Sequence, residues 1–281
     1  MQKPARMRSS IRVQGVIFDW AGTTVDYGCL APAMVFVAGF AARGVTISLD
    51  EARLPMGKYK RDHIAELLAM PAIAERWLAA QGHPPGEADI DALFADFIPR
   101  QEAALLDYAE VIPGAVETAA ALRARGIRIG STTGYTQSMM ALLTPRAAEQ
   151  GYAPDCLITP DMTAGGRPAP WMCYLNAIQL GIYPMMTLVK VGDTMADIAE
   201  GLNAGMWTVA VTRTGNELGL SRANAEALPA SALQRRLEAI EQRFRAAGAH
   251  YIIESIADLL PVIDDIDSRL TQGEHPVTFS F

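Results

Sequence analysis

The sequence predicts an α/β protein with a doubly wound parallel sheet and a helical domain inserted into it. The short apolar run Val16-Ile17-Phe18 ends in Asp19 and has the length and β-branched content of a buried strand. From residue 111 onward, apolar runs of strand length alternate with helical periodicity, which is typical of right-handed βαβ units. Between these two parts, residues 27–107 show helical periodicity and no strand pattern. The expected organisation is therefore a core at residues 1–27 and 108–281, with a helical cap at residues 28–107.

Each expected element follows from its periodicity and from the residues that end it. The first cap helix ends at Gly44, because glycine is favoured just beyond helix C-termini. Beyond the last helix, the polar stretch from Ser268 is expected to be loosely held. The expected helices lie at residues 31–44, 64–68, 72–80, 90–105, 115–125, 136–150, 171–180, 195–204, 231–247 and 256–266. The expected strands after the first lie at residues 127–132, 156–160, 188–193, 207–211 and 250–253.

Composition and charge exclude several classes of function. Of the 281 residues, 50 % are hydrophobic, so the chain can bury a sizeable core. The formal charge of −7 argues against binding to nucleic acid or to an anionic membrane. No apolar stretch is long enough to span a bilayer. Three cysteines without paired spacing, and an N-terminal segment 1–11 without a secretory apolar region, predict a cytoplasmic protein.

Polar side chains follow several of the predicted strands at the point where each strand ends. Because parallel strands present their carboxyl ends at one edge of a sheet, these side chains are expected to meet. Asp19 and Asp193 suit Mg²⁺, which binds through one or two carboxylates and substrate phosphate oxygens. Arg167 suits a phosphoryl or phosphonyl group, and Thr133 and Gly134 are candidate hydrogen-bond donors to it. Each residue alone also fits a turn, a helix cap or a solvated loop charge, but their order favours one pocket.

This order of residues resembles the haloacid dehalogenase superfamily. The matching features are the strand-end Asp19, a Ser or Thr at the end of the second strand, a basic residue before a helix, and Gly192-Asp193-Thr194-Met195-Ala196-Asp197. The resemblance implies a Rossmann-like core, a mobile cap and Asp19 as the nucleophile. It also implies Mg²⁺ bound by Asp19, Asp193 and the backbone carbonyl of Ala21. Asp197 is expected to order this metal site without being a ligand.

Ala21 departs from the pattern of the phosphatases in this superfamily. Those enzymes carry at this position an aspartate that protonates the leaving oxygen, and general acid catalysis of this kind contributes about 10²–10⁴-fold. The alanine therefore disfavours phosphate-ester hydrolysis and favours a leaving group that needs no proton on oxygen. A carbanion expelled from a C–P bond is such a group, and a lysine Schiff base supplies the electron sink that it requires.

The cap offers two lysines for this role, in Pro55-Met56-Gly57-Lys58-Tyr59-Lys60-Arg61-Asp62-His63. Together with Phe18 to Cys29, Gly130 to Thr136 and Gly166 to Tyr174, this stretch resembles the phosphonatase branch of the superfamily over nearly the whole chain. The resemblance implies hydrolysis of the C–P bond of phosphonoacetaldehyde, in the degradation of 2-aminoethylphosphonate, by a homodimer. Lys60 is implied as the Schiff-base lysine, and Lys58 is assigned to a solvated face.

The remaining cap residues receive supporting roles. Burial and the nearby cations Lys58 and Arg61 are expected to lower the pKa of Lys60. Hinges near Tyr27 and Asp107 are expected to control cap closure. His63, one turn after Lys60, is either a proton shuttle or a hydrogen-bonded cap histidine. Substrate-contacting or pocket-lining positions are expected at Cys29, Met56, His63, Thr133, Gly134, Tyr135 and Arg167.

Two other functions remain open from the residues. One is a phosphatase or phosphomutase on the same fold, which Ala21 argues against. The other is a non-catalytic binding module that keeps the pocket, which the full set of Asp19, Asp193 and Arg167 argues against.

Overall fold

Six parallel strands form one sheet in the computed structural model of this protein, which describes residues 11–276. The strand order is β3-β2-β1-β4-β5-β6, so β1 lies inside the sheet, with Ile17 beside Gly130 and Lys190. The predicted doubly wound parallel sheet is thus confirmed. The strands are β1 (Gly15–Phe18), β2 (Arg128–Thr132), β3 (Cys156–Ile158), β4 (Leu188–Gly192), β5 (Trp207–Val211) and β6 (Tyr251–Ile253).

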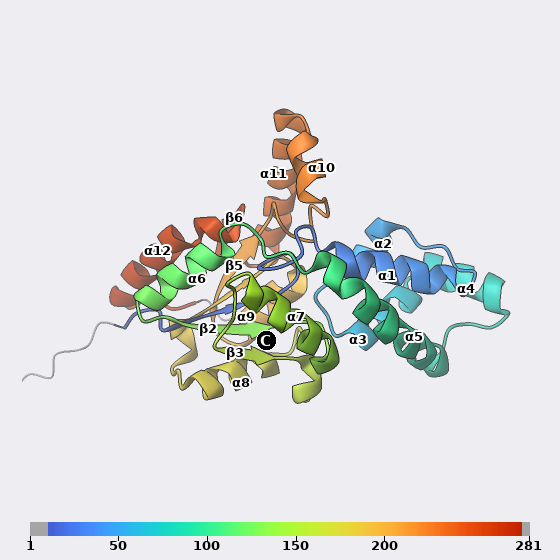
Figure 1. Ribbon diagram of the computed structural model, residues 1–281, viewed down its shortest axis with the longest axis horizontal. Coiled ribbons are helices and arrows are strands. Elements are labelled where there is room, and N and C mark those ends of the chain that lie inside the picture. The colour runs from blue at the N-terminus through green and yellow to red at the C-terminus, as the bar shows by residue number, and fades with distance from the viewer. Residues whose placement is uncertain (1–10, 277–281) are drawn as a thin grey trace, which may run out of the picture.

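Helices cover both faces of the sheet because successive side chains of each strand point to opposite faces. Val16 and Phe18 belong to the apolar cluster that includes α6, α7 and α12, whereas Ile17 packs in the cluster of α8. Figure 1 shows α6 and α12 on one side of the sheet and α8 on the other. The core helices are α6 (Ala115–Ala124), α7 (Gln137–Glu149), α8 (Trp171–Leu180), α9 (Met195–Asn203), α10 (Arg222–Ala227), α11 (Ala230–Ala246) and α12 (Leu259–Thr271). Short 3₁₀ turns lie at η1 (Leu106–Tyr108), η2 (Pro160–Met162), η3 (Met185–Thr187) and η4 (Ile256–Asp258).

Between β1 and β2 the chain forms helices only, here called the helical insert (residues 30–105), which lies at one end of the core (Figure 1). Its aromatic core includes Phe36, which stacks on Phe97 with ring centroids 4.4 Å apart. The chain leaves and re-enters the core side by side, since Val25 bridges Val111 and Ile112 N donates to Thr24 O at 2.8 Å. The helices of the insert are α1 (Leu30–Ala41), α2 (Leu49–Arg53), α3 (Lys60–Ala69), α4 (Pro71–Gln81) and α5 (Glu87–Leu105).

Three features differ from the sequence expectations. The short helices α2 and α10 were not expected, because neither is long enough to show a full apolar period. The last helix continues to Thr271 and buries Leu270, so the expectation of a loose chain from Ser268 is wrong over these residues. The expectation that residues 1–11 are not a secretory signal falls almost wholly on residues 1–10, which lie outside the described part. Among the residues described, no helix has both the length and the apolar character needed to cross a bilayer.

Candidate active site

Side chains from the sheet and from the helical insert line one small cavity. Its volume is about 20 Å³, close to the space that one buried water needs. Asp19 lines this cavity from the core, and Lys60 lines it from the helical insert. Two predicted site residues, His63 and Asp193, are not part of its lining. The lining residues are Asp19, Ala21, Cys29, Pro32, Met56, Gly57, Lys60, Thr133, Gly134, Tyr135, Arg167 and Thr194.

Arg167 holds the candidate nucleophile through a buried hydrogen-bond network. Its Nη2 donates to Asp19 Oδ1 at 2.6 Å, and its Nε donates to Glu200 Oε2 at 2.9 Å. The hydroxyl of Thr132 accepts from Arg167 Nη2 at 2.9 Å and donates to the same Glu200 oxygen at 3.0 Å. Arg167 Nη1 also donates to Gly57 O of the helical insert at 3.1 Å. The guanidinium is therefore fixed on several sides, with one edge turned to Asp19.

Lys190 and Glu200 complete this network, and sequence reasoning missed both. Lys190 Nζ lies 2.5 Å from Asp197 Oδ1 and 3.5 Å from Glu200 Oε2, and all three side chains are fully buried. The only signal in the sequence was a lysine within the apolar strand Leu188–Gly192, where a charge needs a buried partner. With Arg167, these groups alternate in sign, which offsets the cost of burying each of them.

Three carboxylates form a candidate metal centre. Oxygens of Asp19, Asp193 and Asp197 lie within 4.8 Å of one another. Asp193 is oriented by Thr23 Oγ1, which donates at 2.9 Å, and by Asn216 N, which donates at 2.7 Å. Burial, together with the charges of Asp19 and Asp197, raises the pKa of Asp193 well above its usual value.

The pKa of Asp19 is raised in the same way. Burial raises the pKa of Asp19, although Arg167 opposes the effect. A cation among these carboxylates would relieve both shifts, and hard carboxylate oxygens are the donors that Mg²⁺ prefers. The residues present therefore fit a divalent cation.

Asp197 differs from the other two carboxylates because its oxygens are already engaged. Lys190 donates to Oδ1, and Thr194 Oγ1 donates to Oδ2 at 2.6 Å. Arg167 and Lys190 lower the pKa of Asp197 despite its burial.

Gly22 packs so closely on Asp193, with φ of +86°, that any side chain there would collide with the carboxylate. The loop after β1 thus depends on this glycine to approach the metal centre.

Lys60 is the first residue of α3, and only 2 % of its surface is exposed. Its Nζ lies 5.0 Å from the ring centroid of Tyr135 and 5.7 Å from that of Phe36. Burial, helped by Arg167 and opposed by Cys29 and Asp19, lowers the pKa of Lys60 to about 8. Burial thus lowers the pKa of Lys60 in the predicted direction, and the larger fraction of neutral amine near neutral pH suits a lysine that attacks a carbonyl.

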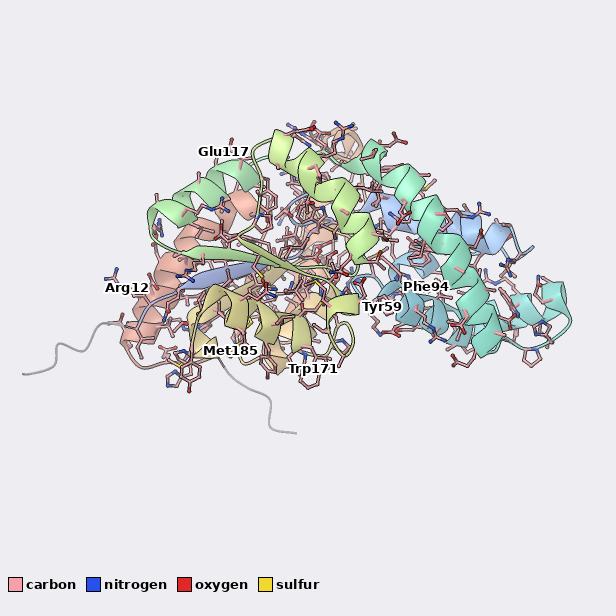
Figure 2. The ribbon with its side chains drawn as sticks, turned by 60° about the horizontal axis from the view of Figure 1, so that its bottom comes forward. Arg12, Tyr59, Phe94, Glu117, Trp171 and Met185 are labelled. Atoms are coloured by element: carbon pink, nitrogen blue, oxygen red, sulfur yellow. The ribbon has the colours of Figure 1, made fainter. Side chains whose placement is uncertain are left out.

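The cation that helps to lower the pKa of Lys60 is neither of the two predicted ones, Lys58 and Arg61. Lys58 pairs with Glu66, while Arg61 pairs with Glu87 at 2.7 Å on the surface. Both charges are thereby satisfied by other groups, and Arg167 of the core is the cation that acts on Lys60. Tyr59, between the two cap lysines, lies where the insert meets the core (Figure 2).

His63 is buried beside the cavity. Its Nε2 lies 2.9 Å from Ala52 O, which only accepts, so Nε2 carries the proton. Burial and the charge of Lys60 lower the pKa of His63 well below its usual value, so the ring is neutral. The ring stacks on Phe36 with centroids 3.8 Å apart, and among the described residues Nδ1 has no hydrogen-bond partner. Burial raises the pKa of Cys29, whose thiol therefore stays protonated and serves as lining.

The fold and the site together define a haloacid dehalogenase-like hydrolase. The defining features are a doubly wound sheet, a strand-end aspartate, an arginine that pairs with it and a second aspartate after β4. A family model of that description matches residues 13–205. The phosphonoacetaldehyde hydrolase of Nitratidesulfovibrio vulgaris is 49 % identical over 264 residues, which are 94 % of each chain. A crystal structure of a phosphonoacetaldehyde hydrolase-like protein from Oleispira antarctica superposes with a TM-score of 0.93 at 42 % identity, covering 95 % of this chain and 97 % of that one.

A third relative, from Clostridioides difficile, is a bifunctional phosphonoacetaldehyde hydrolase/aminoethylphosphonate transaminase. It is 46 % identical over 263 residues, which are 94 % of this chain and 41 % of that protein. The chain belongs to the phosphonoacetaldehyde hydrolase family of haloacid dehalogenase-like hydrolases.

Proposed function

We propose that this protein hydrolyses the C–P bond of phosphonoacetaldehyde to acetaldehyde and phosphate, through a Schiff base on Lys60 and a phosphoryl intermediate on Asp19. The observation that carries the proposal is the position of Lys60. A buried lysine from the helical insert lines the same 20 Å³ cavity as the strand-end aspartate, and Ala21 lines it where phosphatases carry their acid. The activity named for the relatives supports the same reaction.

The first step needs a neutral amine next to the aldehyde. With a pKa of about 8, a useful fraction of Lys60 is neutral near pH 7. Its nitrogen attacks the carbonyl carbon and a C–N bond forms, which gives a carbinolamine. The hydroxyl of this carbinolamine takes up one proton from solvent and leaves as water, so the product is an iminium ion. The rings of Tyr135 and Phe36 stabilise a cation on this nitrogen.

The second step transfers the phosphonyl group to Asp19. The carboxylate oxygen attacks phosphorus, the P–C bond breaks, and its electron pair moves into the iminium to form an enamine. Arg167, fixed by Glu200 and Thr132, donates to the phosphonyl oxygens in exchange for part of its contact with Asp19. Because the leaving carbon is stabilised through nitrogen, no acid is needed at position 21.

Mg²⁺ would be held by Asp19, Asp193 and the backbone carbonyl of Ala21, and it supplies positive charge against the phosphonyl oxygens. Asp197 keeps the neighbouring charges in place through Lys190 and Thr194. Water then hydrolyses the phosphoryl-aspartate, which releases phosphate and regenerates Asp19. The enamine takes a proton on carbon, and hydrolysis of the resulting imine releases acetaldehyde from Lys60.

The size of the cavity requires motion. A space of about 20 Å³ holds about one water, so a substrate of several heavy atoms must enter when the helical insert has moved away. We assign residues 28–107 to a mobile cap with hinges near Tyr27 and Asp107, close to the paired segments at Val25 and Val111. Closure then excludes water from the imine and brings Lys60 to Asp19.

The biological setting follows from the same reasoning. Fusion of one relative to an aminoethylphosphonate transaminase supports a role in 2-aminoethylphosphonate degradation. We also propose that the protein is cytoplasmic and forms a homodimer. Light scattering of the purified protein tests the dimer directly.

Borohydride reduction in the presence of phosphonoacetaldehyde, followed by peptide mass mapping, tests the mechanism. A two-carbon adduct on Lys60 with loss of activity is expected. An adduct on Lys58 would refute the residue assignment and keep the imine route. Phosphate release without a trapped lysine would refute the imine route itself. Phosphate monoesters tested in parallel are expected to be poor substrates, and rapid hydrolysis of them would favour a phosphatase.

A further inference from the structure

Arg53, the last residue of α2 in the helical insert, reaches across to the core. Its Nη1 donates to Asn216 Oδ1 at 3.0 Å, and its Nη2 donates to Gly219 O at 3.2 Å. In return, Asn216 Nδ2 donates to Arg53 O at 3.3 Å. Nη1 also donates to the carbonyls of Gly28 and Cys29, at 3.0 and 3.2 Å. One guanidinium thus joins the insert, the connection that leads into it, and a core loop.

The core loop that Arg53 contacts also orients the metal centre. The backbone N of Asn216 donates to Asp193 Oδ2 at 2.7 Å, and Gly215 packs directly on the Asp193 side chain. Thr214 Oγ1 donates to Gly22 O at 2.8 Å, so the same loop also supports the turn after the nucleophile. A displacement of this loop would therefore move Asp193 directly, because Asn216 contacts both Arg53 and Asp193.

The loop and the connection fit closely enough that their relative position is defined. Gly28 has a φ of +90° and packs on the backbone of Leu220, and Gly28 N donates to Thr214 O at 2.7 Å. A Cβ on Gly219 would lie 2.8 Å from Arg53 Nε. The guanidinium therefore lies in close contact with Gly219, and its hydrogen bonds to Asn216 and Gly219 define one position of the insert against the loop.

The acceptors around Arg53 are neutral, which makes these contacts reversible. Within residues 11–276, Arg53 forms no ion pair with a carboxylate. A cavity of about 290 Å³, lined in part by Arg53, Asn216 and Glu217, brings solvent to the same place. Water can therefore replace the hydrogen bonds when the insert moves, without stranding a buried charge.

We propose that Arg53 is a positioning residue that latches the closed cap onto the Asn216 loop and so couples closure to the position of Asp193. This inference rests on the proposed function, because closure over Lys60 and Asp19 matters only if both act on one substrate. Arg53 lies outside the lining of the catalytic cavity, so its effect is exerted through the position of the cap and of Asn216.

The test compares Arg53→Gln, Arg53→Lys, Asn216→Ala and the Arg53→Gln/Asn216→Ala double variant with the wild type. Arg100→Gln is the matched control, because Arg100 is an exposed cap arginine that pairs with Asp96 on its own helix. Steady-state kinetics with phosphonoacetaldehyde give kcat and KM. Hydrogen exchange with Mg²⁺ and inorganic phosphate follows peptides covering residues 55–60 and 212–220.

For Arg53→Gln we expect kcat/KM to fall about 10- to 100-fold, the loss typical when hydrogen bonds to a charged group are removed. Arg53→Lys should recover part of this loss, and the double variant should be no worse than the more impaired single variant. Exchange should accelerate in both peptides while the strands stay protected. The Arg100→Gln control should match the wild type.

Three results would overturn the latch: wild-type kinetics for Arg53→Gln, losses that multiply in the double variant, or faster exchange throughout the sheet. A wild-type protein that does not turn over phosphonoacetaldehyde would refute the proposed function instead. In that case the exchange of the two peptides, measured with Mg²⁺ and inorganic phosphate alone, still decides whether Arg53 holds the cap.

Discussion

The lowered pKa of Lys60 predicts the pH dependence of imine formation. Burial is the main cause, and it lowers the pKa from 10.5 to about 8. At pH 7 the neutral fraction of such an amine is about 9 %, against about 0.03 % for an unperturbed lysine, a gain of roughly 300-fold. Because the neutral amine is the nucleophile, the rate of imine formation should rise with pH and level off above about 8.

Single-turnover trapping with borohydride over pH 6 to 10 measures this rate for Lys60 alone. Asp26 is a nearby buried carboxyl whose pKa burial raises to about 7, and its charge opposes the shift of Lys60. Lys58→Gln is the control variant, because Lys58 pairs with Glu66 and leaves the buried amine untouched. A trapping rate that keeps rising to pH 10, or one that is flat from pH 6, would refute the reasoning.

The same shift makes a prediction for stability. Burying the charged amine costs the folded state about 3 kcal/mol, at about 1.4 kcal/mol per pKa unit. This cost is fully present below pH 8 and disappears as the pH rises toward 10.5, because the folded state releases its proton first. Lys60→Met should therefore abolish activity and raise the free energy of unfolding at pH 7 by up to about 3 kcal/mol. Urea denaturation at pH 7 and pH 10 should show the gain shrinking at the higher pH.

Three further predictions follow from the site. Asp19→Asn should abolish phosphate release, by about 10³-fold or more, while phosphonoacetaldehyde still forms a borohydride-trapped imine on Lys60; loss of both would mean that imine formation needs the carboxylate. Metal removal by a chelator should abolish phosphate release, and added Mg²⁺ should restore it. Asp193→Asn should raise the Mg²⁺ concentration for half-maximal activity at least about 10-fold. An unchanged Mg²⁺ concentration for half-maximal activity would show that Asp193 does not belong to the metal centre. Gly134→Ala should raise KM while thermal stability stays near the wild-type value, because its Cβ would lie 2.5 Å from Lys58 O and hold the cap away from the core; wild-type kinetics would show that this contact is not part of the closed state.

Local patterns were sufficient for the sheet and for the strand-end residues. The alternation of strands and helices determines a parallel sheet, and the carboxyl ends of its strands then bring Asp19, Thr133 and Asp193 to one edge. Lys60 was placed by a resemblance, and its burial beside Asp19 needed the tertiary arrangement of the insert.

The partners of buried charges were not predictable in the same way. Lys190 occupies a strand position that its apolar neighbours mark as buried, but nothing local identifies Asp197 and Glu200 as its partners. Arg53 ends a helix too short to be detected from periodicity, and its acceptor Asn216 is remote in sequence. Spacing placed His63 one turn from Lys60, whereas packing directs its ring onto Phe36.

The central place of β1 has a consequence for how the chain folds. Ile17 in β1 lies between Gly130 in β2 and Lys190 in β4. Since β2 and β4 are synthesised much later than β1, β1 must wait for both neighbours before it can pair. The helices of the insert pack on one another, as in the Phe36–Phe97 stack, and these contacts lie wholly between β1 and β2, so they can form during this wait. Once Val25 meets Val111, the long loop between β1 and β2 is effectively closed, which lowers the entropy cost of pairing the two strands. The segment that carries Lys60 to the substrate thus also serves the assembly of the sheet that carries Asp19.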